Sequence, residues 1–143
     1  MEEIIRYPGC FVCGHKNLHG LNARFYWDGK AASTEVILTE QFEGYKGISH
    51  GGVVSALLDE VMIKAVLATN RQPVTAELTV KFIKPARTGI PLRFVGHIVS
   101  AKGRLFACEA SVTDPEGTVI AKAEGKFLEG KAELTEELKR SLE

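Results

Sequence analysis

The feature that most constrains the fold of this chain is a long apolar segment that opens with a pair of glycines. From Gly51 to Asn70 almost every position is apolar, on whichever side of a helix it would lie. This pattern predicts a helix that is buried on all sides, because a surface helix keeps one polar face. The rest of the protein must therefore enclose this helix.

The remaining chain shows the alternation of polar and apolar residues that is typical of β-strands. We expect strands over residues 21–27, 31–38, 73–83, 92–101, 104–114 and 118–128. Short turn sequences such as Asp28-Gly29 and Lys102-Gly103 force antiparallel hairpins. The predicted fold class is α+β, with a curled antiparallel sheet wrapped around one long central helix. Because such a sheet covers only part of the helix, we expect a second subunit to cover the remainder.

Length and composition indicate one domain over residues 1–143, with an N-terminal extension over 1–20 and a charged tail, helical or frayed, over 129–143. Basic and acidic residues both number 18, so no net basic field would attract nucleic acid or an anionic membrane. The first residues lack the layout of a signal peptide, and no charge-free apolar run is long enough to span a membrane. Three cysteines cannot all pair within one chain, which suits a reducing compartment. We therefore expect a cytoplasmic protein.

Asp59 is the polar side chain of the predicted helix that most needs an explanation. It has no basic residue one turn away, and helical geometry places it on one stripe with Gly51 and Ser55. Glu60 and Lys64, in contrast, stand four residues apart and are expected to form an ordinary exposed ion pair. Burial in an apolar helix would raise the pKa of the Asp59 carboxyl toward the range of a useful base. Asp59 is therefore a candidate base or nucleophile.

The start of the helix is a candidate site for a developing negative charge. The leading N–H groups of a helix are unpaired, and Gly51 and Gly52 would let a substrate oxygen approach the backbone closely. His50, just before them, is equally well explained as a helix cap. Gly51 and Asp59 are about 12 Å apart along a helix axis, so one helix cannot present both to the same carbonyl group. Two antiparallel copies related by a two-fold axis could do so, and the spacing predicts a homodimer.

Four motifs stand out along the chain. They are Phe-x-Cys-Gly at 11–14, Asn-x-x-Gly-Leu at 17–21, His-Gly-Gly at 50–52 with an aspartate nine residues after the histidine, and a strand at 75–80 that leads to Lys-Pro-Ala at 84–86. Taken together, they resemble the PaaI-like group of hotdog-fold acyl-CoA thioesterases. This resemblance extends over residues 10–128. It implies a homodimer or homotetramer that hydrolyses acyl-CoA to free acid and CoA, with no cofactor beyond the CoA of the substrate.

The same resemblance implies roles for individual residues. The N–H of Gly51 would bind the thioester oxygen, His50 would shape that pocket, and Asp59 of the other subunit would be the nucleophile or base. Thr75 would assist the water or the carboxylate. We also expect Gly52 and Ser55 to contact the substrate.

Two positions depart from the family pattern. Gly44 stands six residues before His50, where some members carry an asparagine, and Leu18 stands where a proline is common. The first departure affects how water or the thioester would be placed. An alternative function is a hotdog protein that binds acyl-CoA without hydrolysing it, but Asp59 argues against this alternative. The related hydratase branch carries a longer motif that this sequence lacks.

Basic residues in the connecting segments are candidates for binding the CoA phosphates. They are Lys84, Arg87 and Arg104. Taken singly, each is also explained as ordinary solvated charge.

The cysteines raise the alternative of a zinc site. Cys10 and Cys13, with His15 and His19 nearby, offer four potential ligands. Structural zinc sites usually separate two ligand pairs by a dozen residues or more, so four ligands within ten residues are poorly spaced. The sequence therefore predicts no stoichiometric metal. Cys108 alternates with apolar residues and is expected in the core.

Overall fold

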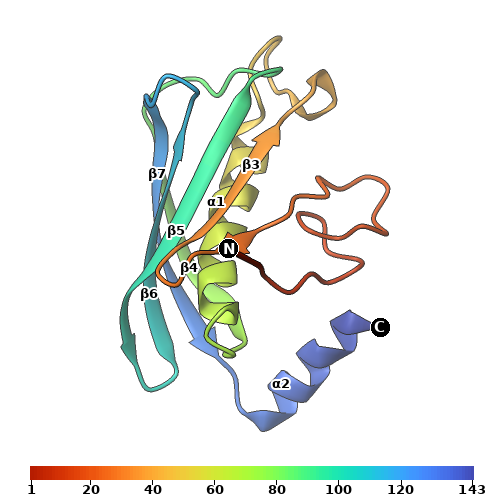
Figure 1. Cartoon of the computed structure of the whole chain (residues 1–143), viewed down its shortest axis with the longest axis vertical. Coiled ribbons are helices and arrows are strands. Elements are labelled where there is room, and N and C mark those ends of the chain that lie inside the picture. The colour runs from red at the N-terminus through yellow and green to blue at the C-terminus, as the bar shows by residue number, and fades with distance from the viewer.

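Helix α1 (Gly51–Leu67) lies along one face of a seven-stranded antiparallel sheet in the computed structural model, which describes residues 1–143 (Figure 1). The strands are β1 (Glu2–Glu3), β2 (Tyr26–Trp27), β3 (Ala32–Ile37), β4 (Pro73–Phe82), β5 (Pro91–Lys102), β6 (Leu105–Thr113) and β7 (Val119–Glu129). Their order across the sheet is β1-β2-β3-β5-β6-β7-β4. The predicted α+β class, with a curled sheet around one long helix, is confirmed.

The core forms where α1 packs on the sheet. Leu57, Leu58 and Val61 of α1 are fully buried in one cluster with Phe94 of β5 and Phe127 of β7. The cluster also contains Cys108, as the alternation in its strand predicted. These side chains hold α1 against the central strands and so determine where the helix begins relative to the sheet.

One face of α1 stays open within a single chain. Gly52 is exposed, and Ser55, Ala56, Asp59 and Ile63 are half-buried. One chain therefore covers only part of the helix, as we expect of a sheet that encloses only the opposite face. The second subunit that we expect over the open face stays a prediction.

Strand β4 forms a long open edge of the sheet. It pairs with β7 along one side and has no strand along its other side. Phe82 at its end and the following Ile83 are 50% and 55% exposed. A long edge strand that carries exposed apolar side chains is suited to contact with another chain.

The predicted strand over 21–27 is reduced to Tyr26–Trp27. Residues 21–25 run instead beside the N-terminal segment, where the Ala23 N–H donates a 2.8 Å hydrogen bond to the Val12 carbonyl. Asn22 interrupts the extended conformation with a φ of 50°. The backbone bonds of this stretch are thus made to a loop rather than to the sheet.

The turn between β2 and β3 is also longer than predicted. Asp28-Gly29 was expected to form a two-residue hairpin, but the turn spans residues 28–31. The Asp28 Oδ1 atom accepts 2.8 Å hydrogen bonds from the N–H groups of Lys30 and Ala31, which stabilises the longer turn.

The two ends of the chain differ in how they pack. Ile4, Val12 and Cys13 of the N-terminal extension are buried in the core. The tail, which we expect to be helical or frayed, forms helix α2 (Ala132–Lys139), and this helix has no buried residue. None of the helices has the length and apolar character that a membrane-crossing helix requires.

Candidate active site

The N-terminus of α1 leaves one backbone donor free. His50 is the helix cap, and its Nδ1 atom accepts a 2.9 Å hydrogen bond from the N–H of Gly52. The His50 carbonyl accepts from Val53 and Val54 at 3.0 and 3.1 Å. The N–H of Gly51 has no acceptor within the chain. The N–H of Gly51 is therefore the donor that a substrate oxygen can use, whereas the N–H of Gly52 already donates to His50.

A cavity of about 620 Å³ opens at this helix terminus. Its lining includes His50, Gly51, Phe82 and Lys84, so apolar surface and one cation lie beside the free donor. The buried hydroxyl of Ser49 also borders it and has no hydrogen-bond partner in the chain. The cavity can therefore accommodate an apolar group whose polar end reaches the Gly51 N–H.

Asp59 and Thr75 form the second half of the candidate site. The Thr75 hydroxyl donates a 2.8 Å hydrogen bond to the Asp59 Oδ1 atom, which joins the open face of α1 to the edge strand β4. Burial raises the pKa of the Asp59 carboxyl, and the hydrogen bond from Thr75 opposes that rise. The carboxyl is thus poised to accept a proton at a higher pH than an ordinary aspartate.

A single chain does not bring the two halves together. Neither Asp59 nor Thr75 is among the residues that line the cavity at Gly51. Asp59 lies about two helical turns further along α1. Ser55, one turn into the helix, is half-buried and does not border the cavity either.

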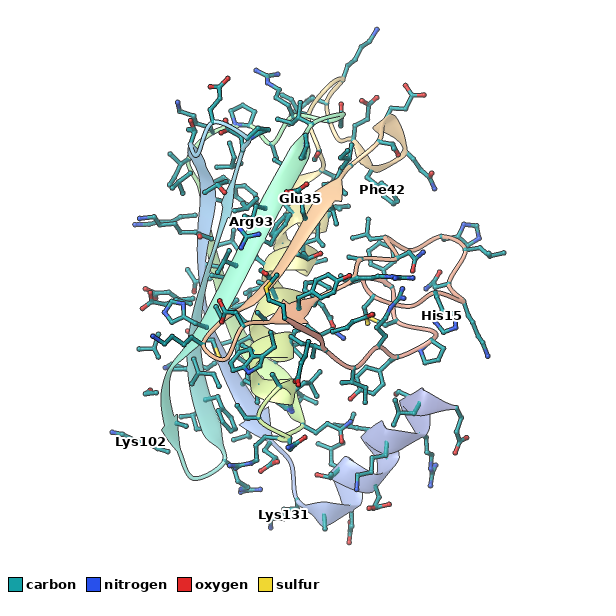
Figure 2. The ribbon with its side chains drawn as sticks, viewed as in Figure 1. His15, Glu35, Phe42, Arg93, Lys102 and Lys131 are labelled. Carbon is teal, nitrogen blue, oxygen red and sulfur yellow. The ribbon has the colours of Figure 1, made fainter.

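The candidate phosphate-binding residues are divided between the two ends of the sheet. Lys84 borders the cavity, and Arg87 is paired through its backbone with Ile48 nearby. Arg104 follows β5 at the opposite end, which Lys102 marks in Figure 2. Within one chain, only the first two lie near the free donor.

Gly44, which departs from the family pattern, lies directly against His50, the cap of α1. A Cβ atom at Gly44 would stand 3.4 Å from the Cδ2 atom of His50. A side chain at this position would therefore contact the imidazole and narrow the cavity.

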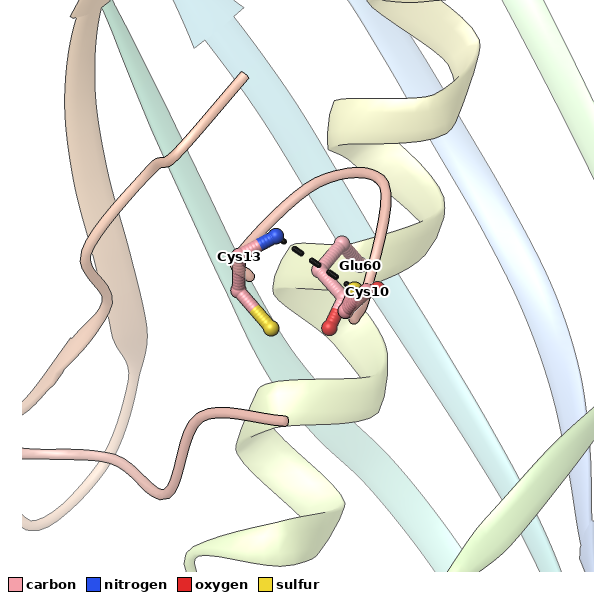
Figure 3. Close-up of side chains that lie close together, drawn as sticks. All are labelled: Cys10, Cys13 and Glu60. Carbon is pink, nitrogen blue, oxygen red and sulfur yellow. Dashed lines mark hydrogen bonds between the residues drawn. The ribbon is translucent and has the colours of Figure 1, made fainter. Parts of the chain in front are cut away.

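A second polar cluster lies further along α1, where the N-terminal extension crosses the helix. Lys64 is completely buried and its Nζ atom is 3.6 Å from Glu60 Oε2, so the prediction of an exposed pair is wrong. Cys10 and Cys13 lie beside Glu60 (Figure 3), and the Lys64 Nζ atom is 3.3 Å from Cys13 Sγ. Burial raises the pKa of Glu60 to about 7, and the nearby Lys64 opposes the rise. The sequence signal that could have indicated this buried cluster was a lysine and a glutamate within a helix predicted to be buried.

The histidines of the zinc alternative do not join this cluster. His15 and His19 are exposed, and His15 lies on the outer part of the N-terminal loop, away from α1 (Figure 2). The structure instead places Glu60 beside Cys10 and Cys13.

Comparison with known proteins identifies similar sequences and folds. Residues 46–121 match the model of the thioesterase superfamily. SSO1253, a provisionally named esterase of Saccharolobus solfataricus, is 34% identical over 84 residues, which are 57% of this chain and 55% of that protein. The chain therefore matches little more than half of the length of this curated relative.

Solved structures share the fold over most of their length. The thioesterase superfamily protein RHA08564 has a TM-score of 0.79 at 26% identity, over 90% of this chain and 68% of that one. A Streptococcus mutans protein bound to acetyl CoA has a TM-score of 0.72 at 20% identity, over 76% of this chain and 89% of that one. PaaI from the E. coli phenylacetic acid degradation operon has a TM-score of 0.72 at 18% identity, over 77% and 80% of the two chains. The predicted hotdog fold of the PaaI-like proteins is confirmed.

Proposed function

The chain belongs to the thioesterase superfamily, and from this premise we propose that it hydrolyses acyl-CoA thioesters to free acid and CoA. The observation that carries the proposal is the Asp59 carboxyl, half-buried on an otherwise apolar helix and held by Thr75. A protein that only bound acyl-CoA would have no need of an acid there, and an unpaired buried carboxyl is costly. We therefore favour hydrolysis over the alternative of a non-catalytic acyl-CoA-binding protein.

The proposed reaction uses both halves of the site. The thioester oxygen accepts a hydrogen bond from the Gly51 N–H, and Asp59 takes a proton from water as the water oxygen attacks the carbonyl carbon. The resulting oxyanion is stabilised by the helix terminus, where one such donor contributes about 2.7–4 kcal/mol. Collapse breaks the carbon–sulfur bond, and the CoA thiolate takes the proton back from Asp59. If Asp59 attacks the carbonyl carbon directly instead, the carbon–sulfur bond breaks, the CoA thiolate leaves and an acyl-aspartyl anhydride forms. Water then hydrolyses the anhydride to the free acid and the Asp59 carboxylate, and the thiolate takes up the proton that is released. Neither route requires a metal or a further cofactor.

Related structures support a CoA ester as the substrate and a role for an aspartate and a threonine in the reaction. The S. mutans protein of this fold was solved with acetyl CoA. A Streptococcus pneumoniae protein of this fold was solved with alanine in place of an aspartate and, separately, of a threonine, and the two positions are 16 residues apart, as Asp59 and Thr75 are here. We extend these features to this chain as part of the proposal.

The proposal includes a dimer whose subunits share each site. A two-fold axis that pairs two β4 edges reverses the strand direction, so the Thr75 end of one copy lies toward the Phe82 end of the other. Phe82 contacts the Gly51 position of its own chain, since a Cβ atom there would stand 3.5 Å from its ring. Such pairing would place Asp59 of one subunit close to the free Gly51 N–H of the other. A homotetramer would be compatible with the same shared site.

A hydrolysis screen tests the proposed activity. Short, medium, long and aryl acyl-CoAs are incubated with the protein, and thiol release is followed. We expect turnover of at least one class and a loss of at least a hundredfold in Asp59→Asn, which keeps the shape and removes the base. Glu124→Gln, an acid-to-amide change at an exposed position of β7, is the matched control. Binding of CoA esters without thiol release in any class would support the binding protein instead.

A further inference from the structure

The cluster at Cys10, Cys13 and Glu60 has no part in the proposed hydrolysis. Both cysteines are free thiols, and Cys13 is completely buried. One ligand atom from each of the three side chains lies within 4.8 Å of the other two, and Cys10 Sγ is 4.0 Å from Glu60 Oε1 (Figure 3). Donor atoms around a tetrahedral zinc ion stand roughly 3.3–3.8 Å apart, given zinc–ligand distances of 2.0–2.3 Å. The observed spacing is within a small side-chain adjustment of that geometry.

The backbone of the N-terminal loop presents both sulfur atoms to α1. The Cys13 N–H donates a 3.3 Å hydrogen bond to Cys10 Sγ, and the Gly14 N–H donates a 2.8 Å bond to the Cys10 carbonyl. A Cβ atom at Gly14 would collide with the backbone of Pro8 and Cys10, so this tight turn requires glycine. This turn therefore places the sulfur atoms of Cys10 and Cys13 beside Glu60 and Lys64 of α1.

Lys64 leaves one carboxylate oxygen free to act as a ligand. Its Nζ atom is 3.6 Å from Glu60 Oε2 and 3.3 Å from Cys13 Sγ, and it donates to the Ile5 carbonyl. The other oxygen, Oε1, faces Cys10. Two thiolates, a carboxylate and an ammonium leave an excess of two negative charges, which a divalent cation would neutralise in this buried position.

We propose that Cys10, Cys13 and Glu60 bind one zinc ion, with water in the fourth position and Lys64 donating to the Cys13 sulfur from outside the coordination shell. The ion would fasten the N-terminal extension to α1. The poor spacing that argued against zinc applied to ligands from residues 10–19 alone. The structure supplies the third ligand from a helix about fifty residues away in the sequence, where no spacing rule could identify it.

Metal analysis of protein purified under reducing conditions without chelators tests the proposal. We expect about one zinc per chain in the wild type and almost none in Cys13→Ser. Glu60→Gln removes the ligand charge and should weaken zinc binding at least tenfold in a competition titration. Cys108→Ser, which removes a buried free thiol outside the cluster, and His15→Ala are the matched controls and should retain the metal.

Cobalt titration provides a second readout that does not depend on the folding of a variant. Metal-free wild-type protein, shown by thiol titration to be fully reduced, should develop thiolate-to-cobalt charge-transfer absorption that saturates at one equivalent. No binding of either metal by this reduced protein overturns the proposal, as does equal zinc content in the Cys10→Ser, Cys13→Ser double variant. A Cys10–Cys13 disulfide that forms when this protein is exposed to oxygen in the presence of excess zinc also overturns it. Metal content is measured independently of hydrolysis, so failure of either proposal leaves the other intact.

Discussion

The hydrogen bond from Thr75 to Asp59 lowers the pH at which the proposed base becomes active. Burial raises the pKa of Asp59. The Thr75 hydroxyl stabilises the carboxylate and makes this rise in pKa smaller. Hydrolysis needs the deprotonated carboxyl, so the rate is low below this pKa and increases as the pH rises through it. Thr75→Val removes the stabilising donor, which moves the acid limb of the kcat/KM profile to higher pH. We expect a shift of about one pH unit, because hydrogen bonds to charged groups contribute about 1.5–3 kcal/mol and this one is partly exposed.

Thr75→Ser keeps a hydroxyl at the same place and is the control for this prediction. Its acid limb should coincide with that of the wild type within a few tenths of a pH unit. An unchanged profile in Thr75→Val, at equal stability by denaturant unfolding, would show that Thr75 does not tune the base.

At the scale of secondary-structure elements, the fit of α1 on β5 depends on a glycine. A Cβ atom at Gly96 of β5 would stand 2.9 Å from the carbonyl oxygen of Val61 and 3.0 Å from its Cγ1 atom. Strand and helix backbones therefore approach so closely that only glycine fits. The contact holds the middle of α1 to the sheet, at the level where Glu60 lies beside Cys10 and Cys13.

Gly96→Ala should separate helix and strand and lower the free energy of unfolding by about 1–3 kcal/mol, as overpacked cores do. Urea denaturation followed by circular dichroism measures the change. Gly9→Ala is the matched control, because a Cβ atom at Gly9 meets nothing within 4 Å, and its stability should stay within about 0.5 kcal/mol of wild type. Equal stability of both variants would mean that the two elements adjust without cost.

For the whole molecule, the proposed site is complete only when two subunits combine. Asp59→Asn damages the acid half of each site. Gly51→Val damages the other half, because a Cβ atom at Gly51 already stands 3.5 Å from the Phe82 ring and the added methyl groups would crowd the N–H. In a heterodimer of the two variants, one site combines both intact halves. Mixing the inactive proteins should restore activity to about half of the wild-type value per heterodimer.

Native mass spectrometry confirms subunit exchange in this experiment, and each variant alone is the control. If heterodimers form and both variants are folded, but no activity returns, the active site lies within one chain and the shared-site proposal is wrong. The free edge of β4 and the open face of α1 would then need another explanation.

The sequence by itself was sufficient for the features that depend on residues close together along the chain. Turn residues and two-residue periodicity placed β4 to β7 within one or two residues of their observed bounds, and the glycine pair marked the start of α1. Asp59 could also be selected as a candidate from the sequence, because an unpaired carboxyl in an apolar helix is costly wherever the helix lies. His50 could be named as a cap on the same local grounds.

Only the tertiary structure decided which side chains are buried by distant segments and which strands lie next to each other. Glu60 and Lys64 have the spacing of an ordinary surface pair, yet Lys64 contacts Cys13, 51 residues away in the sequence, and is fully buried. Strand β4 shows the same alternation as the other strands, yet it lies at an edge of the sheet. It does so because β5 pairs with β3 and β6 and not with β4. Periodicity reports which face of an element is apolar, whereas burial and the meeting of distant side chains depend on packing between segments that no local pattern specifies.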